Sequence, residues 1–168
     1  MMEQARIGPA RVDRPAIPAE YGTSKASEFV KWSHVEDRLT SDRVYWIGTV
    51  DGQMRPSVRP IDGLYLDGVI YVGGSPKTRW VRDLAVNPAV AVHLDGIDDV
   101  IMVEGTAEVR TGMESDLAER LAKASNAKFP EYRMTPQFYR NNGAIAIRPR
   151  TVVTWTDITR NPTRFSFD

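Results

Sequence analysis

An apolar strand sequence runs through two glycines into a basic helix start in the stretch Ile70-Tyr71-Val72-Gly73-Gly74-Ser75-Pro76-Lys77-Thr78-Arg79-Trp80-Val81-Arg82-Asp83-Leu84. The first amides of a helix lack partners within the helix and carry the positive end of its dipole, so an anion placed there accepts several hydrogen bonds. Lys77 and Arg79 would add charge, and Ser75 and Thr78 would add hydroxyl donors. This chemistry is typical of a phosphate site. An ordinary glycine turn followed by a solvated basic helix explains the local pattern equally well.

The helix in this stretch has recognisable ends. Ser75 can cap it and Pro76 suits the first helical position, although the first turn can also begin one or two residues later. Asn87-Pro88 should end it, because proline cannot continue a helix. Two known nucleotide motifs are excluded, since the glycine spacing fits neither a triphosphate loop nor a dinucleotide fingerprint.

Strand patterns surround the helix on both sides. Aromatic and β-branched residues favour strands at 44–50 and 57–66, and Asp67-Gly68 predicts a tight hairpin between the second strand and the opening stretch. Further strands are expected at 89–94, 100–109 and 144–156. Helices are expected from 24 to about 41, after a capping box at Thr111-x-x-Glu114, and at Thr135-Pro136. Short turns between most strands favour a mainly β protein with helices inserted, built on an antiparallel barrel.

The predicted hairpin couples Arg59 to the glycine loop. Arg59 lies about as far before the Asp67-Gly68 turn as the stretch 73–77 lies after it, so its guanidinium can reach the same anion. Pro60 indicates an edge or bulge position, which leaves neighbouring backbone groups free to bind a flat heterocycle. The competing interpretation of Arg59 is an exposed arginine on the barrel surface.

Composition limits the function classes. The 168 residues are 42% hydrophobic and carry 22 cationic and 22 acidic side chains, so we expect a globular protein without affinity for nucleic acid. No apolar run is long enough to cross a membrane and no leader is apparent, so a cytoplasmic location is expected. There is no cysteine, and the two histidines are far apart, so no metal site is predicted. Residues 1–23 are expected to form an irregular N-terminal arm, and residues 24–168 a single domain.

The order of these motifs resembles the flavin-binding split-barrel family that contains pyridoxamine 5'-phosphate oxidase. The order is Pro-Ser-Val-Arg at 56–59, a hairpin and a strand, Gly-Gly-Ser-Pro-Lys-Thr-Arg-Trp at 73–80, a further strand, and Val-Glu-Gly-Thr-Ala-Glu at 103–108. The resemblance covers roughly residues 27–168. It implies a six-stranded antiparallel split β-barrel (Greek key) with peripheral helices, a homodimer, and a cofactor in the groove between the subunits.

The resemblance also implies the cofactor-binding residues. Arg59 matches the family's strand arginine, and Pro60, Ile61 and Asp62 follow it along the isoalloxazine edge. Other matches are the glycine pair Gly73 and Gly74 and the phosphate-binding pair Thr78 and Arg79, with Ser75 in the same loop. Trp80 stands where the family usually has lysine, so Lys77 would supply the missing charge, and Trp80 would either stack on the cofactor or fill the core.

The function implied is a flavin- or deazaflavin-dependent oxidoreductase acting on a small-molecule substrate that the sequence does not identify. Because the ring of the cofactor carries the electrons, no acid–base constellation is needed and no catalytic residue is assigned. FMN is favoured, since it requires one phosphate site, whereas the acidic tail of a deazaflavin coenzyme requires further cations such as Lys25, Lys31 and Arg43. The alternative is a non-enzymatic module that binds a flavin or a haem-type ligand.

Overall fold

We describe the chain from a computed structural model, which defines residues 8–168. The strands are β1 (Arg11–Asp13), β2 (Val44–Val50), β3 (Pro56–Leu66), β4 (Val69–Val72), β5 (Ala89–Leu94), β6 (Val100–Arg110), β7 (Ala144–Trp155) and β8 (Thr163–Ser166). The α-helices are α1 (Trp32–Ser41), α2 (Arg79–Val86), α3 (Ser115–Lys128) and α4 (Pro136–Asn142). The 3-10 helices are η1 (Ala19–Tyr21), η2 (Thr23–Lys25) and η3 (Pro130–Tyr132).

Six of these strands close an antiparallel barrel, as the sequence predicts. The order β7-β4-β3-β2-β5-β6 is completed by pairing of β6 with β7, and β8 and β1 extend the sheet beyond β7. The longest pairing joins β6 to β7 and runs from Val100 opposite Trp155 to Arg110 opposite Ala144. The predicted Asp67-Gly68 hairpin is present, and both residues have the positive φ that this turn requires, 51° and 80°.

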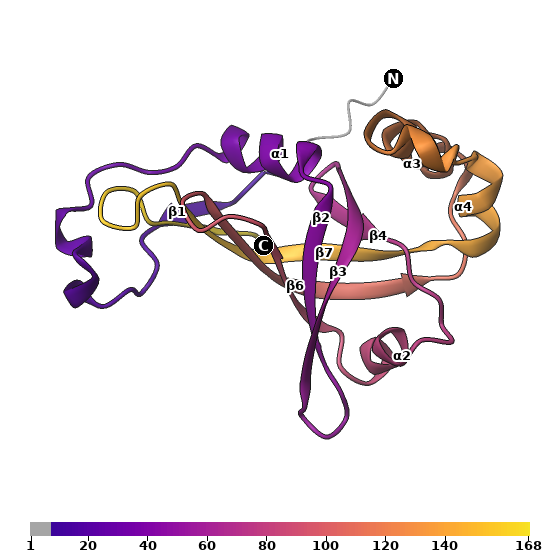
Figure 1. Cartoon of the computed structure of the whole chain (residues 1–168), viewed down its shortest axis with the longest axis horizontal. Coiled ribbons are helices and arrows are strands. Elements are labelled where there is room, and N and C mark those ends of the chain that lie inside the picture. Colours follow the sequence, from indigo (N-terminus) through magenta and orange to yellow (C-terminus); the bar gives the residue numbers. More distant parts are fainter. Residues whose placement is uncertain (1–7) are drawn as a thin grey trace.

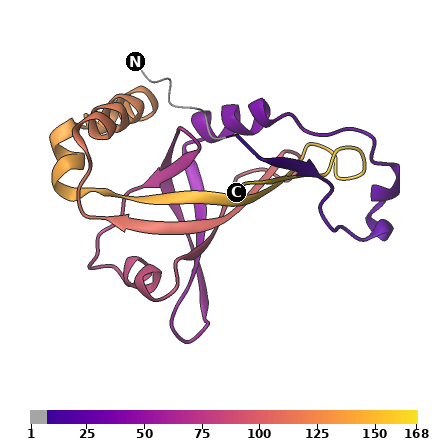
Figure 2. The same cartoon turned by 180° about the vertical axis from the view of Figure 1, so that it is seen from behind.

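The helices occupy separate sides of the barrel. Helix α1 lies along one side, α3 and α4 lie together at one end, and α2 lies on the side opposite α1, in the connection from β4 to β5 (Figure 1). Seen from behind, β1, η1 and η2 and the loop between β7 and β8 project together from the end of the molecule away from α3 and α4 (Figure 2). Arg11 to Asp13 pair there with Arg164 to Ser166.

Two apolar clusters form the core. One fills the barrel, where alternate residues of β2 point inward, and includes Tyr45 and Ile47, both fully buried. The second lies under α3 and α4 and includes Leu121, Phe129 and Tyr139. The barrel thus has one closed interior and one end covered by helices. None of the helices within residues 8–168 is long and apolar enough to cross a membrane.

Several predicted boundaries are wrong. Helix α1 begins at Trp32 rather than near 24, because backbone hydrogen bonds hold the preceding residues to the C-terminal segment: Ser27 N donates to Arg160 O, and Val30 N donates to Thr163 Oγ1. Helix α3 begins at Ser115 after an N-cap at Glu114, so Thr111 does not start a capping box. The arm predicted to be irregular contains β1 and η1 in its described part, and its residues 1–7 lie outside the described chain.

Candidate functional site

The guanidinium of Arg59 is positioned by β2 and β3 and lies at the start of α2. Its Nη1 donates to Thr49 Oγ1 at 3.2 Å, and its carbon Cζ lies 5.1 Å from the centroid of the Trp80 ring. Burial lowers the pKa of Arg59, the charge of Asp83 opposes this, and the charge of Arg79 adds to it. No carboxylate within residues 8–168 forms an ion pair with Arg59. Its contacts on hydroxyl groups and an aromatic ring leave this charge available to an external anion.

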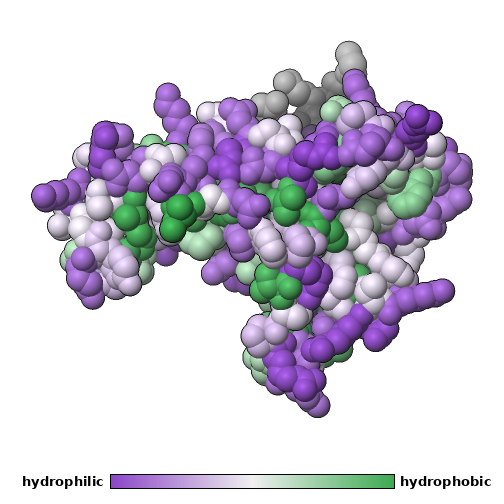
Figure 3. Space-filling view, viewed as in Figure 1, coloured by the Kyte–Doolittle hydropathy of each residue, from purple (hydrophilic) through white to green (hydrophobic). Residues whose placement is uncertain are grey.

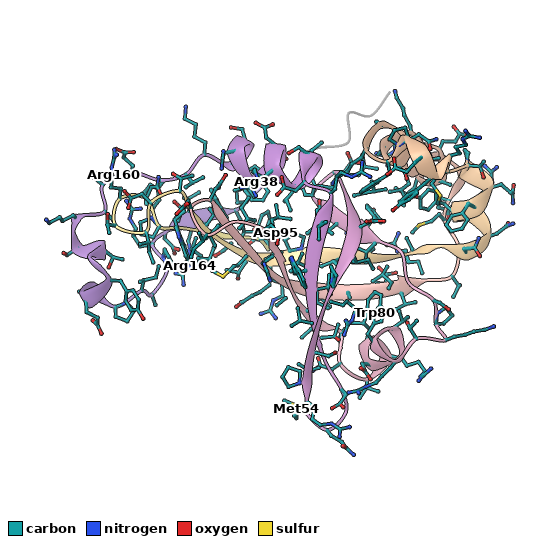
Figure 4. All side chains as sticks on the ribbon, in the orientation of Figure 1. Arg38, Met54, Trp80, Asp95, Arg160 and Arg164 are labelled. Carbon is teal, nitrogen blue, oxygen red and sulfur yellow. The ribbon has the colours of Figure 1, made fainter. Side chains whose placement is uncertain are left out.

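Trp80 and Gly74 fix the approach of the glycine loop to this arginine. Trp80 lies between α2 and the β2–β3 hairpin (Figure 4) and packs against the barrel core. A Cβ atom at Gly74 would lie 2.7 Å from Trp80 Cζ2 and 2.7 Å from Ile145 Cδ1, so a glycine is required for this close contact. Gly73 has open space at the same position. Trp80 therefore packs against the core and also presents a ring face to the guanidinium of Arg59.

Asp51 holds Arg79, an interaction that the sequence does not predict. Arg79 Nη2 lies 2.8 Å from Asp51 Oδ2, which also accepts from Arg55 Nε at 2.9 Å. Asp51 Oδ1 accepts the backbone amides of Gln53 and Arg55. These hydrogen bonds, the backbone bond from Arg55 foremost, lower the pKa of Asp51 to about 2. Asp51 therefore stays charged and ties Arg79 to the β2–β3 hairpin.

The residues before α2 form a separate turn instead of its first helical turn. The backbone amide of Thr78 donates to Ser75 O at 2.9 Å, and the Thr78 hydroxyl donates to the same oxygen at 2.7 Å. Ser75 therefore does not cap the helix and Pro76 is not its first residue; α2 begins at Arg79 with Thr78 as an N-cap that makes no side-chain cap hydrogen bond. The first amides of α2 thus have no side-chain acceptor. Lys77 is exposed in this turn.

The other predicted residues, Pro60, Ile61 and Asp62, are consecutive on β3, and their side chains have different surroundings. Pro60 is exposed, whereas Ile61 packs against the barrel core, so only the backbone of Ile61 is available to a ligand. Strand β4 pairs with β3 only from Gly63 onward, and residues 56–62 therefore have a neighbouring strand on the β2 side alone. This is the edge position that Pro60 indicates. Asp62 points elsewhere, and its carboxylate accepts a hydrogen bond from Tyr132 Oη at 2.5 Å.

Asp62 and Gly73 line a cavity of about 170 Å³ between the barrel and the α3–α4 end. Its aromatic lining comes from Tyr71, Phe129, Tyr132, Phe138 and Tyr139. The structure therefore separates the predicted site residues into two groups. Arg59, Gly74, Arg79 and Trp80 meet near the start of α2, while Asp62 and Gly73 meet at the cavity.

Sequence reasoning missed Asp51, Thr49 and the aromatic residues of this cavity. The turn between β2 and β3 contains a positive φ at Met54, and the Asp51 carboxylate in this turn is 7% exposed. The burial of this carboxylate, whose charge then needs partners, follows from the fold, and no sequence signal marks it. The cavity aromatics come from β4, η3, α4 and the residue after α3, and no sequence period connects them.

A family model described as Pyridoxamine 5'-phosphate oxidase matches residues 32–156. A comparison with curated proteins gave no match. Among solved structures, General Stress Protein 26 from Bacillus anthracis is 21% identical with a TM-score of 0.57, and the match covers 80% of this chain and 99% of that one. An F420 reductase is 19% identical with a TM-score of 0.54, covering 70% and 94%. HutZ, the haem storage protein from Vibrio cholerae, is 17% identical with a TM-score of 0.55, covering 70% and 88%.

Proposed function

Because the chain belongs to the pyridoxamine 5'-phosphate oxidase family, we propose that it is an FMN-dependent oxidoreductase that acts on a small-molecule substrate. The observation that carries this proposal is the partly buried guanidinium of Arg59, which lies over Trp80 and has no carboxylate partner within residues 8–168. A buried cation is costly unless an anion compensates it, and a phosphate would do so. Arg59 and the amides at the start of α2 would hold the phosphate of the cofactor.

The rest of the predicted set supports the same ligand. Arg79 would add a second guanidinium, oriented by Asp51, and Lys77 and Thr78 lie in the adjoining turn. The unpaired edge of β3 at residues 56–62 offers backbone groups to the edge of a flat ring. FMN supplies a ring that accepts and returns a hydride, so the residues of the chain need only bind and orient it and exclude water.

FMN is preferred over F420, the deazaflavin coenzyme, because Arg43, one of the cations that the tail of F420 would need, already has partners in the protein. The long acidic tail of F420 requires cations beyond one phosphate site. Arg43 is already occupied, since it forms an ion pair with Glu131 and donates to Lys128 O at 2.7 Å. The similarity to an F420 reductase keeps this coenzyme as an outcome of the test.

We also propose that the protein is a cytoplasmic homodimer. The outer barrel surface exposes apolar side chains, including Val58 at 61% and Met102 at 39%, and the rings of Trp46 and His93 stack beside them at a centroid distance of 6.1 Å. Figure 3 shows hydrophobic patches on this side of the molecule. A second copy of the chain would cover this surface and complete a groove for the cofactor.

Titration with FMN tests the proposal, and the arginine variants localise the site. We expect a yellow complex that dithionite bleaches, and Arg59→Gln should weaken FMN binding by about 1.5–3 kcal/mol, roughly 10- to 150-fold. Arg79→Gln should weaken it less, because Asp51 and Asp83 already share the charge of Arg79. Arg160→Gln is the matched control, since Arg160 lies at the far end of the molecule and pairs with exposed Glu28 (Figure 4). Unchanged affinity in Arg59→Gln would move the phosphate site elsewhere.

A haem-binding module is the second candidate, favoured by the similarity to HutZ and by one histidine. His34 is held by Asp99 Oδ1 at 2.9 Å, whereas His93 is exposed and uses only its Nδ1, 3.2 Å from Leu94 O. The Nε2 of His93 is thus available as a ligand to iron. A Soret band that forms on haem addition and is lost in His93→Ala would support this candidate. FMN binding without such a band would exclude it.

A further inference from the structure

The cavity shared by Asp62 and Gly73 is lined by five aromatic rings together with aliphatic and small residues. Tyr71, Phe129 and Tyr139 are 8%, 2% and 7% exposed and form its buried side. Tyr132 and Phe138 are 48% and 45% exposed and stand at its rim. The volume of about 170 Å³ is close to the roughly 150 Å³ that accommodates a benzene-sized molecule in a protein interior. The cavity therefore fits one ring or a compact branched group.

A single charged side chain, that of Asp62, is present among the described residues that line this cavity. Burial raises the pKa of both Tyr71 and Tyr139, and the hydrogen bond to Asp62 raises the pKa of Tyr132, so all three phenols are neutral at pH 7. The lining thus combines ring faces with one carboxylate.

Two cations contact the Phe129 ring and are engaged elsewhere. Arg43 stacks on Phe129, with Cζ 4.5 Å from the ring centroid, and its charge is paired with Glu131. Lys128 Nζ donates to Gly63 O at 2.8 Å and to Leu39 O at 3.2 Å. Neither residue lines the cavity. An occupant would therefore meet the carboxylate of Asp62 and the aromatic rings directly.

We propose that this cavity binds a small organic ammonium ion whose apolar body is about one ring in size. Aromatic faces attract cations through the quadrupole of the ring, and the carboxylate of Asp62 would neutralise the charge. Gly73 lines the cavity and begins the loop that leads into α2, where Trp80 lies against Arg59. That this ammonium compound is the substrate class rests on the proposed function, whereas its binding does not.

Calorimetric titration with benzylammonium and its neutral counterpart benzyl alcohol tests the proposal on the full chain. We expect benzylammonium to bind about five- to tenfold more tightly than the alcohol, as a cation–π contact with a nearby carboxylate provides. Asp62→Asn should remove this preference while the alcohol binds as before. Phe138→Leu should weaken both compounds, because it removes a rim ring without altering charge. Asp98→Asn, at an exposed position in the β5–β6 turn, is the control.

Each outcome separates this inference from the proposed function. Equal affinity for the two compounds, or a preference that survives Asp62→Asn, would overturn the ammonium site, and so would a lack of binding by either. Repeating the titration after saturation with FMN tests the substrate role. If benzylammonium binds with Asp62-dependent preference but FMN does not bind, the proposed function fails and the ammonium site stands. If FMN binds and benzylammonium does not, the reverse holds.

Discussion

The loop before α2 and the helical cover formed by α3, η3 and α4 are built in opposite ways around the end of β4. The loop side gathers the guanidinium groups of Arg59 and Arg79 and leaves the start of α2 without a side-chain cap. The helical side gathers aromatic rings, and its helix α4 is capped by Thr135, whose side chain accepts from Phe138 N. The two sides meet at Gly73. One strand end thus separates the proposed phosphate site from the proposed ammonium site.

The two sides of the barrel differ in which groups they present and in how their charges are compensated. On the loop side the charges of two arginines are only partly compensated, and Asp51 is the residue that restrains one of them. On the helical side one charged side chain, that of Asp62, lines the cavity, together with aromatic rings and aliphatic residues. An electron-carrying cofactor and an ammonium compound with an apolar body would need two such neighbouring environments, so each prediction below alters one side and leaves the other as its control.

The largest effect on stability is expected at Gly73 and Gly74, which lie where the loop side meets the helical side. Gly74→Ala places a methyl group 2.7 Å from Trp80 and Ile145, and we expect a loss of about 1–2 kcal/mol in the free energy of unfolding, since overpacking forces side chains apart. Gly73→Ala meets no atom within 4 Å and lacks positive φ, so its effect should stay within about 0.5 kcal/mol. Urea denaturation measures both. Equal losses would show that Gly74 does not set the position of α2.

The next largest effect on stability is expected from the N-cap residues of α4 and α2. Thr135→Ala removes the acceptor for Phe138 N, at 3.2 Å, and should lower the free energy of unfolding by about 1 kcal/mol. Thr78→Ala removes a hydroxyl that donates to Ser75 O instead of capping α2, so the change should be within about 0.5 kcal/mol. Thermal unfolding of both variants measures the contrast. A comparable loss in Thr78→Ala would mean that the start of α2 is not open to an anion.

The strands and their hairpin follow from local sequence, which explains why the barrel is predictable. In β2 the alternation of inward and outward residues is complete, and Asp67-Gly68 has the turn residues that its φ angles demand. Counting from that turn also predicts the approach of Arg59 to the loop. The start of α1 is not predictable in this way, because hydrogen bonds from Ser27 and Val30 to residues more than a hundred positions away keep the preceding segment extended.

The partners of the candidate site depend on the same long-range packing. Asp51 reaches Arg79 only because α2 crosses beside the β2–β3 hairpin. Asp62 faces the cavity instead of lying among the arginines, since Tyr132, 70 positions later, supplies its hydrogen bond. A sequence period marks faces of single elements, whereas these contacts join elements that no period relates.

The last prediction concerns the pH dependence that Asp51 on the loop side gives to stability. Its pKa of about 2 in the folded protein lies below the ordinary value of 3.8, so the unfolded chain binds more protons between about pH 4 and pH 2. The stability that Asp51 contributes is therefore complete above about pH 4 and is lost as the pH falls toward 2. Asp51→Asn lacks this group, and the difference in unfolding free energy between the two proteins should shrink over that interval.

Acid titration of unfolding, followed by circular dichroism from pH 6 to pH 2, measures this difference directly. The other acidic residues remain in both proteins, so their contribution to acid unfolding cancels in the comparison. A difference that stays constant through pH 2 would mean that Arg55 and the backbone amides of the turn do not hold the Asp51 carboxylate. The turn would then not fix Asp51 beside Arg79, Arg79 would retain its ion pair with Asp83 at 3.7 Å, and Arg79→Gln should weaken FMN binding more nearly as Arg59→Gln does.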